Sequence, residues 1–525
     1  MKNKIYYLLT ILACVFLSGC FNDDSSLSDG SVKDITVDGF AQSYVATAYT
    51  DKPLKISPSV KIGSEEANAD NAVFQWYLIN DKTGKVTSKG DTIQPIVIGH
   101  DKDLDFDVAV APGKYQLRYE VTDKQSGYTV FKYAPLYVQT VFSQGFYILK
   151  QTPDGNTDVD VLNEDGTLSQ NILQKTSGSP MAGKPLNLAA LYNSCYINEE
   201  TNEMEAVDAI SITTEANNFG IYRATDFKRI FDKSNLSFEP LNDTEKPYGF
   251  LYASVLGHVY FSTGGARSAS GPSYDGSLNS GKYGMPFSNI QGSQYFCHDI
   301  PSSGGIFLWD NATHGLYAMN YIGDVSPLQY DDLTGSDITQ NLTDYDCLTC
   351  GYNLMNRVGT AVFVLEDKKN GDRYLYQTKS DFDQMYLKRR DKIPADFHLA
   401  KSSLFSVNAS SAKYIYCVDN NKVYATIFSN DNLSEVKIPV KIGAGETIAY
   451  IGNQFYYNEF NYLVVGTQKG DHYKLYFFKL VGGAPDGDAV LTAEGTGSVA
   501  SVKFLHNGFD SRMWDFSIAM YNANN

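Results

Sequence analysis

The chain has 525 residues, of which 43 are Lys or Arg and 60 are Asp or Glu, so its formal charge at pH 7 is −17. This acidic balance, with no Lys/Arg-rich run, argues against nucleic acid as a partner. With 43% hydrophobic residues, 38 Tyr and 29 Phe, the chain is not intrinsically disordered, and its aromatic, Gly-rich composition favours β structure.

Residues 1–19 have the pattern of a secretory signal peptide. Lys2 and Lys4 precede an apolar run from Ile5 to Leu17, which is too short for a membrane-spanning helix. The run leads into the sequence LSGC, which ends at Cys20 and resembles a bacterial lipobox. This resemblance implies cleavage before Cys20 and attachment of lipid to its thiol. The alternative is an ordinary signal peptide followed by a chance Cys.

Residues 20–31 are rich in Ser, Asp and Gly. Such a segment cannot bury enough apolar surface to fold, so it is predicted to be a flexible tether. The acidic pair Asp23 and Asp24, close behind Cys20, resembles the surface-export signal of Bacteroidetes lipoproteins. The resemblance implies a lipid anchor in the outer membrane with the protein facing the cell exterior. If the acids only solubilise the tether, the protein faces the periplasm instead.

Residues 32–140 are predicted to form one β-sandwich. The sequence VFQWYLI at 73–79 contains Trp76, and residues 115–122 alternate between apolar and polar side chains as in a strand with one wet face. Short strands at this spacing, with a Trp on an early central strand, predict a seven-strand sandwich with Trp76 in its core. The stretch PGKYQLRYEVTDKQSGYTVFKYAPLYV, with Trp76 upstream, resembles PKD-type immunoglobulin-like domains.

Residues 141–525 are predicted to form a β-propeller, because hairpin signals recur along them. Each unit consists of an apolar strand, a polar turn and a second apolar strand, as in TAVFVLEDKKNGDRYLYQT, and the average of 55 residues per unit suits four-stranded blades. The predicted turns are Asp154-Gly155, Asn217-Asn218, Leu256-Gly257, Thr313-His314, Asn370-Gly371, Asn420-Asn421 and Lys469-Gly470. Seven blades are predicted and eight are the alternative. Unrelated hairpins in two sandwiches would give a similar pattern.

A propeller must also close into a ring. The apolar segments at 501–509 and 513–520 are predicted to pair near the strand at 145–149 and so to complete the first blade.

The order of these parts resembles that of the PKD-like lipoproteins of Bacteroidetes. The resemblance rests on the lipobox at Cys20, the acidic tether, the PKD-like sandwich and the propeller-like hairpins. It implies an accessory role in nutrient capture beside a TonB-dependent transporter and a SusD-like lipoprotein (the SusC/SusD type). The ligand implied is a peptide or an oligosaccharide.

The sequence contains no motif for a catalytic nucleophile, a zinc protease, a phosphate-binding loop or a dinucleotide site. We therefore expect a binding protein without catalytic residues, cofactor or metal. A carboxylate pair assembled in the mouth of the propeller would instead make a surface glycoside hydrolase, lyase or peptidase.

Cys347 and Cys350 have the spacing of a redox or zinc motif. No second Cys or His pair lies near them, and a βαβ context is absent. They are interpreted as small strand or loop residues, and a local disulfide between them is left open.

The region from Gly264 to Gly305 is the candidate for a binding loop. Nine Gly and nine Ser alternate there with aromatic residues, and we expect an ordered insertion with no strand or helix of its own. Aromatic rings on adaptable loops suit sugar stacking and peptide capture. Tyr274, Tyr283, Phe287 and the nearby Trp309 are the predicted ligand contacts, with a core position as the alternative for Trp309.

Overall fold

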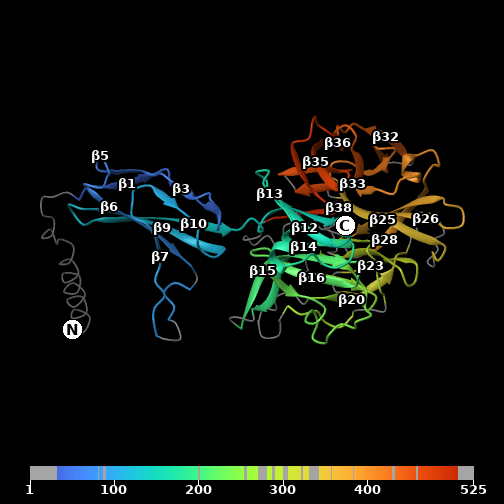
Figure 1. Cartoon of the computed structure of the whole chain (residues 1–525), viewed down its shortest axis with the longest axis horizontal. Helices are drawn as coiled ribbons and strands as arrows, with labels where there is room; N and C mark the ends of the chain where they lie inside the picture. Colours follow the sequence, from blue (N-terminus) through green and yellow to red (C-terminus); the bar gives the residue numbers. More distant parts are fainter. Residues whose placement is uncertain are drawn as a thin grey trace, which may run out of the picture. The chain divides into compact units, whose positions relative to one another are not determined.

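The computed structural model describes residues 32–80, 82–86, 90–198, 202–253, 257–269, 281–286, 290–298, 305–320, 323–329, 342–355, 358–381, 384–428, 432–456 and 459–506. The chain divides into two compact units, Met1–Val138 and Gln139–Asn525. In the described residues of both units, nearly all regular secondary structure is β-strand, which confirms the predicted all-β class (Figure 1). In the described ranges, no helix is both long enough and apolar enough to cross a membrane.

The first unit is a β-sandwich. Its main sheet has the order β2 (Tyr44–Thr47), β10 (Thr129–Gln139), β9 (Gly113–Asp123), β6 (Ala72–Ile79) and β7 (Ile96–Gly99). A smaller sheet contains β1 (Ile35–Asp38), β4 (Ser59–Ile62) and β5 (Glu65–Glu66), and β3 (Leu54–Ile56) pairs with β8 (Leu104–Phe106). The described part therefore has ten strands rather than seven. Several of them have only two to four residues, too few to give a hydrophobic pattern.

Trp76 lies at the centre of the sandwich, as the sequence predicts. Its side chain is fully buried, and its ring stacks on Tyr119 with the ring centroids 4.0 Å apart. The indole Nε1–H donates to the carbonyl of Asp101 at 2.9 Å, so the buried polar group is satisfied. Along β9, alternate residues from Tyr115 onward are buried, which confirms the strand with one wet face.

The second unit contains seven sheets among its described residues, here numbered as blades 1 to 7 from the N-terminal side. Blade 1 has, from its innermost strand outward, β38 (Ser498–Leu505), β11 (Gly145–Gln151), β12 (Thr157–Leu162) and β13 (Leu168–Ser169). Blade 2 has β14 (Pro185–Asn198), β15 (Glu203–Thr214), β16 (Asn218–Arg223) and β17 (Arg229–Phe231), and blade 3 has β18 (Pro247–Ala253), β19 (Gly257–Ser262) and β20 (Gly265–Ser268). Helix α2 (Ile172–Ser177) follows β13.

The other four blades have the same antiparallel arrangement. Blade 4 has β21 (Phe296–His298), β22 (Ile306–Asp310), β23 (Gly315–Met319) and β24 (Val325–Pro327), and blade 5 has β25 (Tyr345–Met355), β26 (Val358–Asp367), β27 (Arg373–Asp381) and β28 (Gln384–Lys392). Blade 6 has β29 (Phe405–Val407), β30 (Tyr414–Asp419), β31 (Lys422–Ile427) and β32 (Ser434–Ile438). Blade 7 has β33 (Thr447–Tyr456), β34 (Phe460–Lys469), β35 (His472–Val481) and β37 (Leu491–Thr496), with β36 (Ala484–Pro485) at the end of β35.

The seven blades close into a ring. The innermost strands pack beside one another in the order β38, β14, β18, β21, β25, β29 and β33, and β33 packs beside β38 again. Within blade 1, β38 pairs antiparallel with β11, with Gly145 opposite Leu505 and Ile148 opposite Val502. Figure 1 shows β38, at the red end of the colour scale, with the blue-green strands of blade 1. The predicted propeller and its seven blades are thus confirmed. The predicted closure near residues 145–149 is confirmed for β38, while the rest of the predicted tail, residues 507–525, lies outside the described part.

Packing between blades explains the hydrophobic strands. Every residue of β12 and of β22 is buried, because each sheet is covered on both faces by its neighbours. Six of the seven predicted hairpin turns hold a residue with positive φ between two paired strands, including His314 at 48° and Asn420 at 49°. Asn and Gly are favoured there because they adopt the left-handed region at low cost.

The interpretation of residues 264–305 as an insertion without strands of its own is wrong. This region contains β20, the outer strand of blade 3, and β21, the innermost strand of blade 4. Each has only three or four residues, and β20 is half Gly and Ser, so its sequence looks like a loop. The pairing of β20 with β19 and of β21 with β22 forms these strands.

Candidate binding pocket

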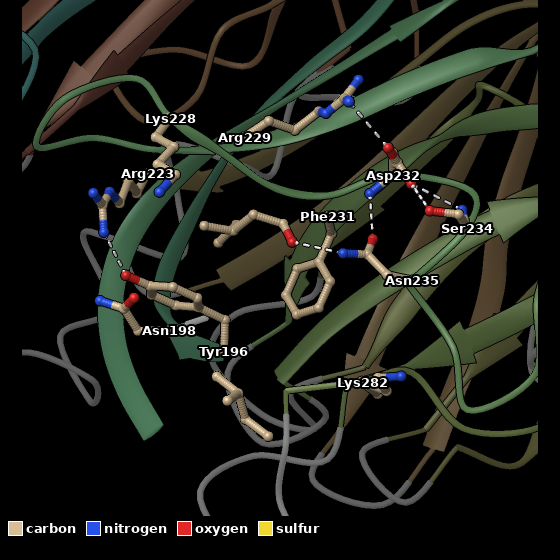
Figure 2. Close-up of a pocket in the computed structure, with 12 residues that line it drawn as sticks. Tyr196, Asn198, Arg223, Lys228, Arg229, Phe231, Asp232, Ser234, Asn235 and Lys282 are labelled. Atoms are coloured by element: carbon tan, nitrogen blue, oxygen red, sulfur yellow. Dashed lines mark hydrogen bonds and ion pairs between the residues drawn. The ribbon is translucent and has the colours of Figure 1, made fainter. Parts of the chain in front are cut away.

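A polar pocket of about 450 Å³ opens on blade 2 (Figure 2). Its lining comes from the end of β14, the corner between β16 and β17, the loop after β17, and the short segment that carries Lys282. The volume lies within the range of small-molecule sites in proteins. The pocket is therefore large enough for a ligand of one or a few sugar or amino-acid units.

One wall of the pocket is a hydrogen-bonded network around Arg223. Its guanidinium binds Asp226 through two bonds, Nε to Oδ1 at 2.6 Å and Nη2 to Oδ2 at 2.5 Å. Nη1 also donates to the hydroxyl of Tyr196 at 2.7 Å, and that hydroxyl donates to Glu205. The bonds to Asp226 raise the pKa of Arg223, and burial, with Glu205 as a second cause, raises the pKa of Tyr196 to about 12. Arg223 therefore stays charged and Tyr196 stays neutral at neutral pH.

The opposite wall is a tight turn after β17. Ser234 donates to Asp232 Oδ1 through its backbone N–H at 2.9 Å and its hydroxyl at 2.6 Å. Asn235 accepts from the backbone N–H of Asp232 at 2.8 Å and donates from Nδ2 to the carbonyl of Ile230 at 3.1 Å. Arg229 Nη2 lies 3.3 Å from Asp232 Oδ2. These bonds fix the turn without help from a ligand.

Charged and apolar groups are combined in this pocket. Its cationic residues are Arg223, Lys228, Arg229 and Lys282, and its one acidic residue in the described lining is Asp232. Figure 2 shows Arg223 and Lys228 on one side, Arg229 at the top and Lys282 at the bottom. Apolar surface comes from Ile197, which is 48% exposed, and from neighbouring strand residues. The mixture suits a ligand that has both polar groups and an apolar face.

The predicted ligand contacts do not form this pocket. Tyr283 and Trp309 are 1% and 2% exposed and belong to the cores between blades. Tyr274 and Phe287, like the predicted lipidation site Cys20, lie outside the described residues. For Trp309, the core position given as the alternative is the one found in this structure.

The pocket residues themselves were not predicted from the sequence. Arg223, Lys228 and Arg229 fall within seven positions around a strand end, and this local concentration of cations in an acidic chain was the available signal. Lys282 carries no such signal, because its approach to blade 2 depends on the fold of blade 3.

A second cavity, of about 280 Å³, follows the central channel of the propeller. It is lined by innermost strands, including β14, β25, β33 and β38. Lys503 on β38 is 3% exposed, and burial lowers its pKa to about 7. The charge interaction with Cys350 on β25 raises the pKa of Lys503 and so opposes part of this shift. Burial raises the pKa of Tyr450. No Asp, Glu or His stands among the described residues that line this cavity.

The five cysteines of the described chain are free thiols and are buried, so the disulfide left open between Cys347 and Cys350 is not formed in this structure. Burial raises the pKa of Cys347 well above its ordinary value, with Cys350 as a second cause. Within the described ranges, no three His, Cys, Asp or Glu side chains gather in a way that suits a metal ion.

Thiol titration checks this description. In protein from which residues 1–31 have been removed, we expect all five thiols to resist an aromatic disulfide reagent under native conditions, because the thiolate is the reacting form and burial disfavours it. All five should react after denaturation in guanidinium chloride without a reductant. Rapid native labelling, or a deficit of two thiols after denaturation, would contradict the structure.

The N-terminal part of the chain is similar to a known family. The model of the PKD-like family matches residues 20–185, which confirms the predicted PKD-like resemblance for this part of the chain. A comparison with curated proteins finds no match.

Solved structures are similar over much of the chain, with low scores. A quinonprotein alcohol dehydrogenase-like protein from Bacteroides thetaiotaomicron is 14% identical, with 90% of this chain and 99% of that chain covered and a TM-score of 0.40. Apo AztD from Citrobacter koseri is 11% identical, with 82% and 100% covered and a TM-score of 0.31. A polysaccharide lyase of family PL25, an ulvan lyase, is 10% identical, with 64% and 90% covered and a TM-score of 0.35. At these identities and TM-scores, the matches carry no argument about ligand or activity.

Proposed function

We propose that this protein is a non-catalytic, lipid-anchored protein of the bacterial cell surface that binds a nutrient, either a peptide or a glycan, and assists a SusC/SusD-type TonB-dependent importer. The observation that carries the proposal is the pocket on blade 2, where guanidinium, ammonium, amide and hydroxyl groups surround a volume of about 450 Å³. The lipobox-like sequence at Cys20 and the acidic tether behind it support a surface address.

The N-terminal sandwich has a separate task in this proposal. It serves as a spacer that holds the propeller away from the membrane, or as the surface that docks on the importer. Its closed core around Trp76 supports a rigid module rather than a binding pocket.

Affinity capture tests this function. We expect the tagged full-length protein to recover a TonB-dependent transporter and a SusD-like lipoprotein from solubilised outer membranes. The Cys20→Ser variant removes the thiol that would carry the lipid, so it should leave the membrane fraction and lose both partners. Recovery of no transporter by the wild-type protein would contradict the proposal.

A second candidate function has one supporting observation. Burial lowers the pKa of Lys503 in the central channel to about 7, so its amine is available as a base near neutral pH. A surface glycoside hydrolase, lyase or peptidase would use that channel as its active site. Turnover of an oligosaccharide or a peptide by the purified protein, lost in a Lys503→Met variant, would favour the enzyme over the binding protein.

A further inference from the structure

The pocket on blade 2 concentrates positive charge in an acidic protein. Four cationic side chains and one carboxylate line it, whereas the chain as a whole has a formal charge of −17. Two further carboxylates, Asp226 and Glu205, lie around Arg223 and offset part of that charge. Asp232 offsets part of the charge of Arg229, with Oδ2 3.3 Å from Nη2, and Lys228 and Lys282 add positive charge to the lining.

Lys282 is held in place by the residues on either side of it. Gly281 has φ of +72°, and a Cβ built there would lie 1.6 Å from the carbonyl oxygen of Cys195, so any other residue would clash with β14. On the other side, Tyr283 is buried, its N–H donates to Leu236 at 2.8 Å, and its carbonyl accepts from Ser237 Oγ at 2.6 Å. The fold therefore fixes the backbone of Lys282 beside the pocket. In the part of the chain that the structure describes, no carboxylate pairs with its ammonium group.

The geometry disfavours a peptide that adds as a strand to the edge of blade 2. The edge strand β17 has only three residues. The side chain of Asn235 already donates to the carbonyl of Ile230, which an added strand would need as an acceptor. A peptide in this pocket would therefore be recognised through its side chains rather than by strand addition to β17.

We propose that this pocket binds an oligosaccharide that carries negatively charged substituents, either uronate carboxylates or sulfate esters. This inference rests on the proposed role in nutrient capture. Lys282 on one side of the pocket, and Arg229 beside Asp232 on the other, bind charged groups of the ligand (Figure 2). Ammonium and guanidinium groups form strong charge-assisted hydrogen bonds with such oxygens. Asn198, whose Nδ2 donates to Glu205 Oε1 at 2.8 Å, lines the pocket beside the sugar, and Ile197 covers the apolar face of the sugar.

The overall charge of the protein sharpens this selectivity. A chain of formal charge −17 repels polyanions in general, so only a local cluster of cations brings an anionic sugar to the surface. Binding should consequently weaken as the salt concentration rises, whereas binding of a neutral sugar should not.

Titration calorimetry with the full-length protein in detergent tests the proposal. The probes are an oligogalacturonate, a sulfated oligosaccharide of equal length, a neutral oligogalactose and an oligo-Glu peptide. We expect one or both anionic sugars to bind, and Lys282→Met to weaken that binding about tenfold, the effect of losing a charge-assisted hydrogen bond. Arg229→Gln should act in the same direction, and Lys175→Met, at an exposed position on α2, should have no effect. The two sugar arms distinguish carboxylate from sulfate.

Three results overturn the inference. They are failure of both anionic sugars to bind, neutral sugar bound as tightly as charged sugar with Lys282→Met unaffected, or preference for the oligo-Glu peptide. Binding of the neutral sugar or the peptide would leave the proposed capture function standing. Failure of all four probes, together with recovery of no importer, would remove both. Unchanged melting temperatures of the variants separate lost binding from lost folding.

Discussion

Replacement of Asp160 by Ala is expected to destabilise the propeller by about 3–5 kcal/mol, because it leaves a buried ammonium without its counter-charge. Lys150 and Asp160 are both completely buried on adjacent strands of blade 1, with Nζ 2.7 Å from Oδ1. Lys150 also donates to Asn171 at 2.8 Å. From blade 7, Tyr473 donates its hydroxyl to Asp160 Oδ2 at 2.6 Å, so the same carboxylate joins the two blades at the closing interface.

Urea denaturation followed by tyrosine fluorescence measures this effect. The double variant Lys150→Met/Asp160→Leu removes both charges and should recover part of the lost stability, because no unpaired charge remains buried. Recovery is incomplete, since the Tyr473 hydroxyl still loses its acceptor. Tyr473→Phe should cost about 1.5–3 kcal/mol, the effect of one hydrogen bond to a charged group. If Asp160→Ala unfolded within about 1 kcal/mol of the wild type, the pair would have no role in holding the ring closed.

Replacement of Lys503 by Met is expected to stabilise the propeller by about 3–5 kcal/mol at or below pH 7. Burial lowers the pKa of Lys503 from 10.5 in the unfolded chain to about 7 in the folded chain. Between these values the unfolded state binds more protons, so the wild-type stability rises with pH across that window. Below pH 7 the folded wild type has the full cost of a buried charge, and above about pH 10.5 that cost is absent.

The melting temperature of the propeller at a series of pH values tests this sign. The advantage of Lys503→Met should be largest in acid and should shrink steadily as the pH rises from neutral towards 10. Lys479→Met, on an exposed position of β35, controls for the general removal of a cation from the protein. An advantage that is equal at all pH values would show that packing, rather than ionisation, determines the cost of Lys503.

Local signals allowed most of the architecture to be predicted from the sequence. Asn420 and Gly371 mark turns because their type suits positive φ, and the apolar strands on both sides are visible without knowledge of the fold. The pairing of β38 with β11 could be predicted because the last strand of a propeller must complete the first blade. In contrast, β20 and β21 were missed, since strands of three or four residues acquire their conformation from pairing and not from their own pattern.

The candidate pocket could not be predicted in the same way. Tyr283 and Trp309 are aromatic residues in a Gly- and Ser-rich setting, which indicates ligand contact as well as it indicates a core. Their burial depends on residues of other blades, and no short stretch of sequence contains that information. Likewise, Arg229 and Lys282 are far apart in the chain and come together only when blade 3 folds against blade 2.

The position of β38 in blade 1 has a consequence for the order in which the protein can fold. Until residues 498–505 have emerged, β11 has an unpaired inner edge, and such an edge is a template for pairing with other chains. The strands of the sandwich all lie between residues 35 and 139, so each of them has its pairing strand available early. For a chain that emerges from its N-terminus, the sandwich can fold while synthesis or translocation continues. The propeller can close its ring only after its last strand, β38, has emerged. A chaperone that protects the first blade would have to remain bound for nearly the whole passage.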